Sequence, residues 1–147
     1  MRIYLDLCCL KRPFDDQTQP RIAVETSAVL AILQAMADGR VQVIRSLAHD
    51  LENSRNPDAR RARAVDTWLN TLNPVESTPR SVVEHVERLA ASGLRVMDAY
   101  HLAWAEHMGA DVLVTTDDAF ASQCGRLGDI IRVRVMNPVA LAGELPA

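Results

Sequence analysis

Short apolar runs alternate with longer amphipathic segments along most of this chain. The run at residues 112–115 is apolar without alternation, which is typical of a central parallel strand covered on both faces. The run at residues 2–5 ends abruptly in Asp6, and a polar loop follows at residues 11–17. On this basis we predict strands at residues 2–5, 41–44, 112–115 and 130–135, and a further short strand at residues 75–78.

Between these runs, apolar residues recur at helical spacing. Ile22, Thr26 and Val29 share one face of a helix whose start suits Pro20 and whose end suits Gly39. Apolar side chains cover most of the circumference of residues 97–108, so we expect this helix to be buried on several sides. The predicted helices are residues 20–38, 46–54, 58–72, 80–91, 97–108 and 117–123.

The alternation of strands with helices predicts the fold class. It indicates parallel strands joined by right-handed crossovers. The 147 residues are enough for one domain with a substantial core. We therefore expect one α/β domain over residues 1–147, with a central parallel sheet of four to five strands flanked by helices.

Four acidic residues are placed where such a sheet gathers functional groups. Asp6 and Asp117 follow predicted strands directly, Glu52 lies in the helix after the second strand, and Asp98 lies in the first turn of the buried helix. Sites in open α/β sheets form at the carboxyl ends of the strands. Four carboxylates at one point would repel each other, and Mg²⁺ or Mn²⁺, which prefer oxygen ligands, would relieve that repulsion.

Each acid also has a structural interpretation. Asp98 could serve only to complement the helix dipole, and Asp117 could serve as a helix N-cap. Glu52 taken alone is typical of a solvated helix position. The placement of all four together is what favours a shared site.

Composition narrows the classes of function. The net charge of −3 argues against a protein that holds nucleic acid by bulk positive charge. The three cysteines and four scattered histidines do not supply the spacing of a zinc site. No apolar run approaches the roughly 18 residues of a membrane span, and the first residues lack the features of a secretory signal. The cysteines are odd in number, two of them are adjacent and none forms a C-x-x-C pair, so we expect a cytoplasmic protein.

The C-terminal half carries the most specific motif. Residues 98–105 read Asp-Ala-Tyr-His-Leu-Ala-Trp-Ala, and residues 109–117 read Gly-Ala-Asp-Val-Leu-Val-Thr-Thr-Asp. Together with residues 4–17 and 52–58, these segments resemble the PIN domain family, in particular the ribonuclease toxins of the VapC type. The resemblance covers residues 2–135.

This resemblance implies a three-layer PIN-like fold and a Mg²⁺- or Mn²⁺-dependent endoribonuclease in which Asp6, Glu52, Asp98 and Asp117 hold the metal and catalyse RNA hydrolysis. It also implies a toxin that a small antitoxin protein neutralises, and a homodimer. Leu7 and Cys8 stand where the family usually has a hydroxyl or amide side chain, which bears on metal affinity and turnover.

Further residues are candidates for accessory roles at such a site. Thr115, Thr116 and Asp118 flank the acids, although structural hydroxyls and a helix cap explain them equally well. Glu25 interrupts an apolar helix face, which indicates either the edge of the site or an ion pair with an arginine. Lys11 and several arginines, which bind phosphate well, are candidates to contact RNA: Arg12, Arg55, Arg60, Arg61 and Arg63.

Two rival functions remain open at this point. A receiver-like phosphoacceptor domain also places acids around Mg²⁺, but it needs a lysine after its last strand and the only lysine is Lys11. A PIN scaffold without catalytic activity, which binds RNA or a protein partner, is the other alternative, and Leu7 and Cys8 keep it open.

Overall fold

A four-stranded parallel sheet forms the centre of the computed structural model, which describes residues 1–147. The strands lie in the order β2-β1-β3-β4. Their bounds are β1 (Arg2–Leu5), β2 (Gln42–Ile44), β3 (Val112–Val114) and β4 (Arg134–Met136). The predicted α/β class with a parallel sheet is confirmed.

Two of the strand predictions need correction. Residues 75–78 form no strand, because Val75 is the only apolar residue there and Glu76 and Ser77 face solvent. At residues 130–135 the strand begins only at Arg134, because the chain first makes a 3₁₀ turn at Gly128–Ile130. A short apolar run thus does not by itself decide between strand and loop.

The six predicted helices are present with small shifts at their ends. They are α2 (Pro20–Ala37), α3 (Leu47–Ser54), α4 (Ala59–Leu69), α5 (Arg80–Ala91), α6 (Val96–His107) and α7 (Asp118–Gly125). Two helices of five residues were not predicted, because they are too short to show helical periodicity: α1 (Leu7–Lys11) and α8 (Pro138–Ala142). A 3₁₀ turn at Arg12–Phe14 extends α1.

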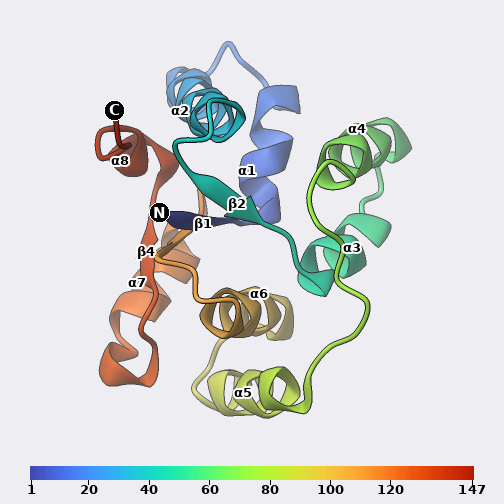
Figure 1. Ribbon diagram of the computed structural model, residues 1–147, viewed down its shortest axis with the longest axis vertical. Coiled ribbons are helices and arrows are strands. Elements are labelled where there is room, and N and C mark those ends of the chain that lie inside the picture. The colour runs from blue at the N-terminus through green and yellow to red at the C-terminus, as the bar shows by residue number, and fades with distance from the viewer.

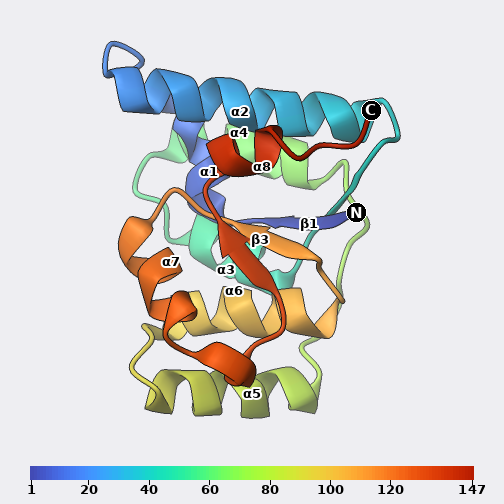
Figure 2. The same cartoon turned by 90° about the vertical axis from the view of Figure 1, so that its left-hand side faces the viewer.

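Helices cover both faces of the sheet (Figures 1 and 2). The helices α1, α2 and α8 lie on one face, α6 lies against the other, and α5 packs on the outer side of α6. The helices α3 and α4 lie beyond the β2 edge (Figure 1). This is the expected arrangement of a central sheet between helical layers, with α5 as an additional outer element.

The alternation along β1 divides the core into two clusters. Ile3 and Leu5 pack with Val29 and Ile32 of α2 on one face. Tyr4 points to the opposite face, where it joins side chains of α6, including Leu102, Ala103 and Trp104. Tyr4 is fully buried, so its hydroxyl must find partners inside the protein.

The ladder between the central strands continues to the point where the acidic residues begin. The N–H of Asp6 donates to the carbonyl of Val114, and the N–H of Thr115 donates to the carbonyl of Met136. The backbone of residues 6 and 115 is therefore held by the sheet itself. Side chains at these positions are placed by strand geometry and not by mobile loops.

Candidate metal centre

Asp6 lies at the carboxyl end of β1 and caps the start of α1. Its Oδ1 accepts the N–H of Leu7 at 2.8 Å, and its Oδ2 accepts the hydroxyl of Thr115 at 2.7 Å. The residue is only 6% exposed, so these two donors replace most of its hydration. The carboxylate is fixed in orientation, and each oxygen keeps acceptor capacity beyond the bond it makes.

Glu52 reaches Asp6 from the last turn of α3. Its Oε1 lies 2.7 Å from Nε2 of His101, which in turn lies 3.9 Å from Oδ1 of Asp6. Ligand atoms of Asp6, Glu52 and His101 all lie within 4.8 Å of one another, which is close enough for one ion. This is the tightest group of metal-binding side chains in the protein.

The pKa values of Glu52 and His101 move apart because the two groups interact. Burial alone would raise the pKa of Glu52, but the hydrogen bond from His101 and the charges of His101 and Lys11 lower it below its ordinary value. Burial alone would lower the pKa of His101, but the hydrogen bond to Glu52 and the charges of Asp6, Glu52 and Asp98 raise it. Glu52 is therefore ionised at neutral pH.

Asp98 and Asp117 complete an outer part of the same acidic cluster. Burial and the charges of Asp6 and Asp117 raise the pKa of Asp98 to about 6, although Arg95 acts in the opposite direction. Arg95 forms only a long ion pair with Asp98, with 4.0 Å between Nε and Oδ2, and its side chain is largely exposed. Asp117 caps α7 by accepting the N–H of Phe120 at Oδ1, which leaves Oδ2 without a protein donor. The effect of their charges on Asp98 indicates that Asp6 and Asp117 lie near enough to Asp98 to interact with it.

Thr115 supplies a hydroxyl beside Asp6 that the residues directly after Asp6, Leu7 and Cys8, do not supply. Leu7 is fully buried and offers no polar atom. The thiol of Cys8 lies 3.4 Å from Oδ2 of Asp6 and 3.4 Å from the hydroxyl of Thr115. Thr115 also accepts the N–H of Asp117 at 3.1 Å, so it connects two of the acids. Thr115, which follows β3, thus orients the carboxylate of Asp6. The family resemblance places a hydroxyl or amide for this role directly after Asp6, where this chain has Leu7 and Cys8.

The other three accessory candidates, Glu25, Thr116 and Asp118, do not contact the carboxylates of the acidic cluster in the way that Thr115 does. Glu25 is only 2% exposed, and it binds Arg12 at 2.9 Å, Arg21 at 3.4 Å and the amide of Asn137 at 2.6 Å. Asp118 is exposed and forms a bidentate ion pair with Arg21. These contacts favour the structural interpretation of Glu25 and Asp118. The hydroxyl of Thr116, a buried residue, makes no hydrogen bond in the structure.

The arginines divide into two groups. Arg12 and Arg61 are both tied to Asp15, and Arg61 also binds Asp58. Their charges are therefore largely compensated within the protein. By contrast, the other four candidates for RNA contact make no side-chain ion pair or hydrogen bond: Lys11, Arg55, Arg60 and Arg63.

A polar cleft opens beside the acidic cluster. It has a volume of about 290 Å³ and runs between the α1 segment and the start of α4, and its lining includes Cys8, Lys11, Asn56 and Arg61. Cys8 belongs both to this lining and to the surroundings of Asp6. The cleft therefore adjoins the acidic cluster at Cys8, although none of the four acids lines it.

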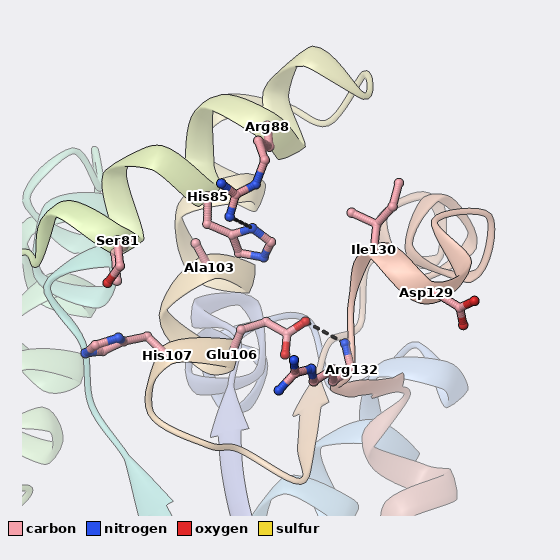
Figure 3. A pocket seen from close by; sticks show the side chains of 10 residues that line it. Ser81, His85, Arg88, Ala103, Glu106, His107, Asp129, Ile130 and Arg132 are labelled. Atoms are coloured by element: carbon pink, nitrogen blue, oxygen red, sulfur yellow. Dashed lines mark hydrogen bonds between the residues drawn. The ribbon is translucent and has the colours of Figure 1, made fainter.

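A second cleft of about 370 Å³ lies between α5, α6 and the segment before β4 (Figure 3). Arg88 donates to His85 at 3.1 Å, and the N–H of Arg132 donates to Glu106 at 2.6 Å. Glu106 is eight residues beyond Asp98 on α6, which corresponds to about 12 Å along a helix. This cleft is therefore separate from the acidic cluster.

His101 and Tyr4 are the residues at this centre that the sequence interpretation missed. The four histidines look scattered along the chain, but His49 and His101 meet beside Tyr4 with ring centroids 5.3 Å apart. The available signal was the position of His101, three residues after Asp98 on the same helix face.

The fold and the site together define a class: a parallel α/β protein with an acidic centre at the carboxyl edge of its sheet. The family model described as PIN domain matches residues 3–125, and the chain belongs to the PIN domain family. No curated protein and no solved structure matches the chain. The predicted family is thus confirmed, and the VapC-like subtype stays a prediction.

Proposed function

We propose that this protein is a metal-dependent endoribonuclease. The observation that carries the proposal is the group of Asp6, Glu52 and His101, whose ligand atoms lie within 4.8 Å of one another. The raised pKa of Asp98, to which burial and the charges of Asp6 and Asp117 contribute, supports including Asp98 and Asp117 in the same site. Membership in the PIN domain family points to a nuclease, and PIN nucleases use divalent metal ions.

The donor set fits Mg²⁺ or Mn²⁺. All four acids offer carboxylate oxygens, which these hard cations prefer. Glu52 and Asp117 each use one oxygen for a protein hydrogen bond and keep the other oxygen free of donors. A bound cation would supply Lewis-acid activation of water and neutralise charge that develops on the phosphodiester.

The protein's own residues supply position and charge for this chemistry. Leu7 and Thr115 fix Asp6, and α7 fixes Asp117, so little reorganisation is needed during the reaction. No serine, cysteine or histidine nucleophile is required. Cys8 lies next to Asp6, but its role here is that of a weak hydrogen-bond partner.

RNA is the proposed substrate class. The unpaired cations Lys11, Arg55, Arg60 and Arg63 are available to phosphates, and Lys11 lines the cleft that adjoins the acidic cluster. Arg12 and Arg61 of the predicted RNA-binding set would act mainly through the shape of this cleft, because acids already compensate their charges. The cleft would contact the RNA next to the cleavage site.

A finer proposal concerns biological context. Likeness to the VapC motifs supports a toxin of a toxin–antitoxin pair, with an antitoxin protein and a second copy of this chain as partners.

None of the helices combines the length and the apolar character that a membrane-spanning segment requires.

The test is Mn²⁺-dependent cleavage of mixed single-stranded RNA by the wild type and by Asp98→Asn. We expect cleavage by the wild type and a loss of at least about 100-fold in Asp98→Asn, since one carboxylate of the cluster is removed. Asp129→Asn is the matched control, because Asp129 is an exposed acid outside the cluster. Equal cleavage by wild type and Asp98→Asn would indicate contamination. Binding of RNA without cleavage in any divalent metal would favour the scaffold alternative.

A further inference from the structure

Four side chains form a continuous hydrogen-bonded chain from the start of α3 to the acidic cluster. The hydroxyls of Ser46 and Tyr4 are 2.6 Å apart, the Tyr4 hydroxyl lies 2.7 Å from Nδ1 of His101, and Nε2 of His101 lies 2.7 Å from Glu52. Ser46, Tyr4 and His101 are at most 1% exposed. Water therefore does not compete for these bonds.

The hydrogen bond to Glu52 determines which ring nitrogen of His101 carries a hydrogen. A carboxylate can only accept hydrogen bonds, so the bond between Glu52 and His101 requires a hydrogen on Nε2. A protonated Nε2 has no free lone pair. In this arrangement His101 cannot use Nε2 as a metal ligand, even though the ring lies within reach of Asp6 and Glu52.

The Ser46 end fixes the direction of the remaining bonds. The Ser46 hydroxyl oxygen accepts the N–H of Ala48, since Ser46 caps α3. The hydroxyl hydrogen has one available acceptor, the oxygen of Tyr4. When the His101 ring is neutral, the Tyr4 hydrogen then points to Nδ1 of His101, so every hydrogen in the chain has one acceptor.

His49, which lies beside Tyr4, does not change the direction of these hydrogen bonds. Its Nδ1 accepts the N–H of Ser46, and its Nε2 donates to the carbonyl of Leu5 at 2.6 Å. Both ring nitrogens are therefore occupied, and the ring only stacks on Tyr4 with a centroid distance of 4.6 Å. His49 offers Tyr4 neither a donor nor an acceptor.

Reversing the chain would leave a buried group unsatisfied. For Nε2 to bind a cation, the hydrogen must move to Nδ1, and Tyr4 must then donate to Ser46. The Ser46 hydrogen would have no acceptor in the core, which is a costly state for a buried hydroxyl.

We propose that His101 is a positioning residue whose tautomer is set by Ser46 and Tyr4, and that it holds Oε1 of Glu52 so that Oε2 is left for the cation. The relation to a cation rests on the proposed function. The tautomer itself does not, because it follows from contacts within the protein.

The direct test is ¹⁵N NMR of the histidine rings in the wild-type protein, first without metal and then with Mg²⁺. At a pH where the ring is neutral, we expect Nε2 of His101 to carry a hydrogen and Nδ1 to carry none in both states. An Nε2 without hydrogen, either before or after addition of Mg²⁺, would overturn the proposal.

The second test compares Tyr4→Phe with Tyr100→Phe. Both variants remove one hydroxyl, but the hydroxyl of Tyr100 bonds to Thr78 and lies outside the chain. Titration with Mg²⁺ should show affinity about 10–100-fold weaker in Tyr4→Phe and unchanged in Tyr100→Phe, as for other residues that orient metal ligands. Unchanged affinity and an unchanged His101 tautomer in folded Tyr4→Phe would contradict the proposal.

The two tests separate this inference from the proposed function. A wild type that binds no Mg²⁺ would remove the proposed function, while the metal-free NMR spectrum would still decide the tautomer. A wild type that binds Mg²⁺ through an Nε2 without hydrogen would retain the metal centre and overturn the positioning role.

Discussion

The hydroxyl of Thr115 donates to Oδ2 of Asp6 at 2.7 Å, across the two central strands of the sheet. The hydroxyl oxygen of Thr115 also accepts the N–H of Asp117. One side chain thus holds the acid after β1 and the start of the segment after β3 in a fixed relation. Since Leu7 cannot contribute a hydrogen bond through its side chain, the orientation of Asp6 depends strongly on Thr115.

Thr115→Val should weaken metal binding. The substitution keeps the shape of the side chain but removes the donor to Asp6 and the acceptor for Asp117, so we expect Mg²⁺ affinity to fall about 10–100-fold. Stability should fall by about 1–3 kcal/mol, because a buried carboxylate loses a hydrogen bond. Calorimetric titration and urea unfolding measure the two effects. Thr67→Val is the control, since that exposed hydroxyl bonds only to the carbonyl of Arg63; equal losses in both variants would contradict the prediction.

Asp98→Asn should stabilise the metal-free protein at neutral pH. The pKa of Asp98 is about 6 in the folded protein and 3.8 ordinarily, so the folded state favours the protonated form. The stability gained by protonation is present at low pH and is lost as the pH rises through about 6. The asparagine cannot lose a proton, so we expect a gain of about 1–2 kcal/mol at pH 7.5 after allowance for solvent screening.

Urea unfolding in EDTA at pH 4 and pH 7.5 measures this difference. The advantage of Asp98→Asn should be present at pH 7.5 and small at pH 4. An advantage of equal size at both pH values would show that repulsion among the carboxylates is not its cause.

Divalent cations should stabilise the wild type in a pH-dependent way. Ligand present at about 100 times its dissociation constant stabilises a protein by about 2.7 kcal/mol. Below pH 6 a proton occupies Asp98 and competes with the cation, so the rise in Tm with Mn²⁺ should be larger at pH 7.5 than at pH 5. Thermal unfolding with Mn²⁺ or EDTA measures it, and Asp98→Asn should show a much smaller rise. A rise that is independent of both pH and Asp98 would place the cation elsewhere.

Two arginine substitutions should affect different properties, one the binding of RNA and the other the stability of the fold. Arg60→Ala removes an exposed, unpaired cation, so RNA binding should weaken and its salt dependence should fall by about one unit of slope, with little change in stability. Arg12→Ala leaves the buried Glu25 without its shortest ion pair, so stability should fall by about 2–4 kcal/mol. Fluorescence anisotropy with labelled RNA and urea unfolding distinguish the two roles. A large loss of stability in Arg60→Ala would show that this side chain is structural.

Periodicity predicted the parts of the fold that are long or repeated. The helix at residues 20–38 and the apolar strand at residues 112–115 were placed closely, because burial of a continuous face leaves a clear pattern. Residues 75–78 gave a wrong strand, since one apolar residue carries too little pattern. The start of α8 had a signal that was not used, because Asn137 and Pro138 are typical of a helix N-terminus.

The sequence indicated which acids follow strands, but not their hydrogen-bond partners. The partners of Asp6 and Glu52, namely Thr115 and His101, are 109 and 49 residues away along the chain. Pairings of this kind depend on strand order, and the order β2-β1-β3-β4 is not encoded in local spacing. Glu25 shows the same limit, since its partner Asn137 lies 112 residues away.

The last 22 residues have a consequence for how this protein is handled. The family match ends at residue 125, yet β4 pairs with β3 and Asn137 holds the buried Glu25. A chain cut at the family boundary would leave β3, an entirely apolar strand, as an open edge. Open apolar edges invite pairing with other chains, so such a fragment is expected to aggregate and to be mistaken for an inactive protein.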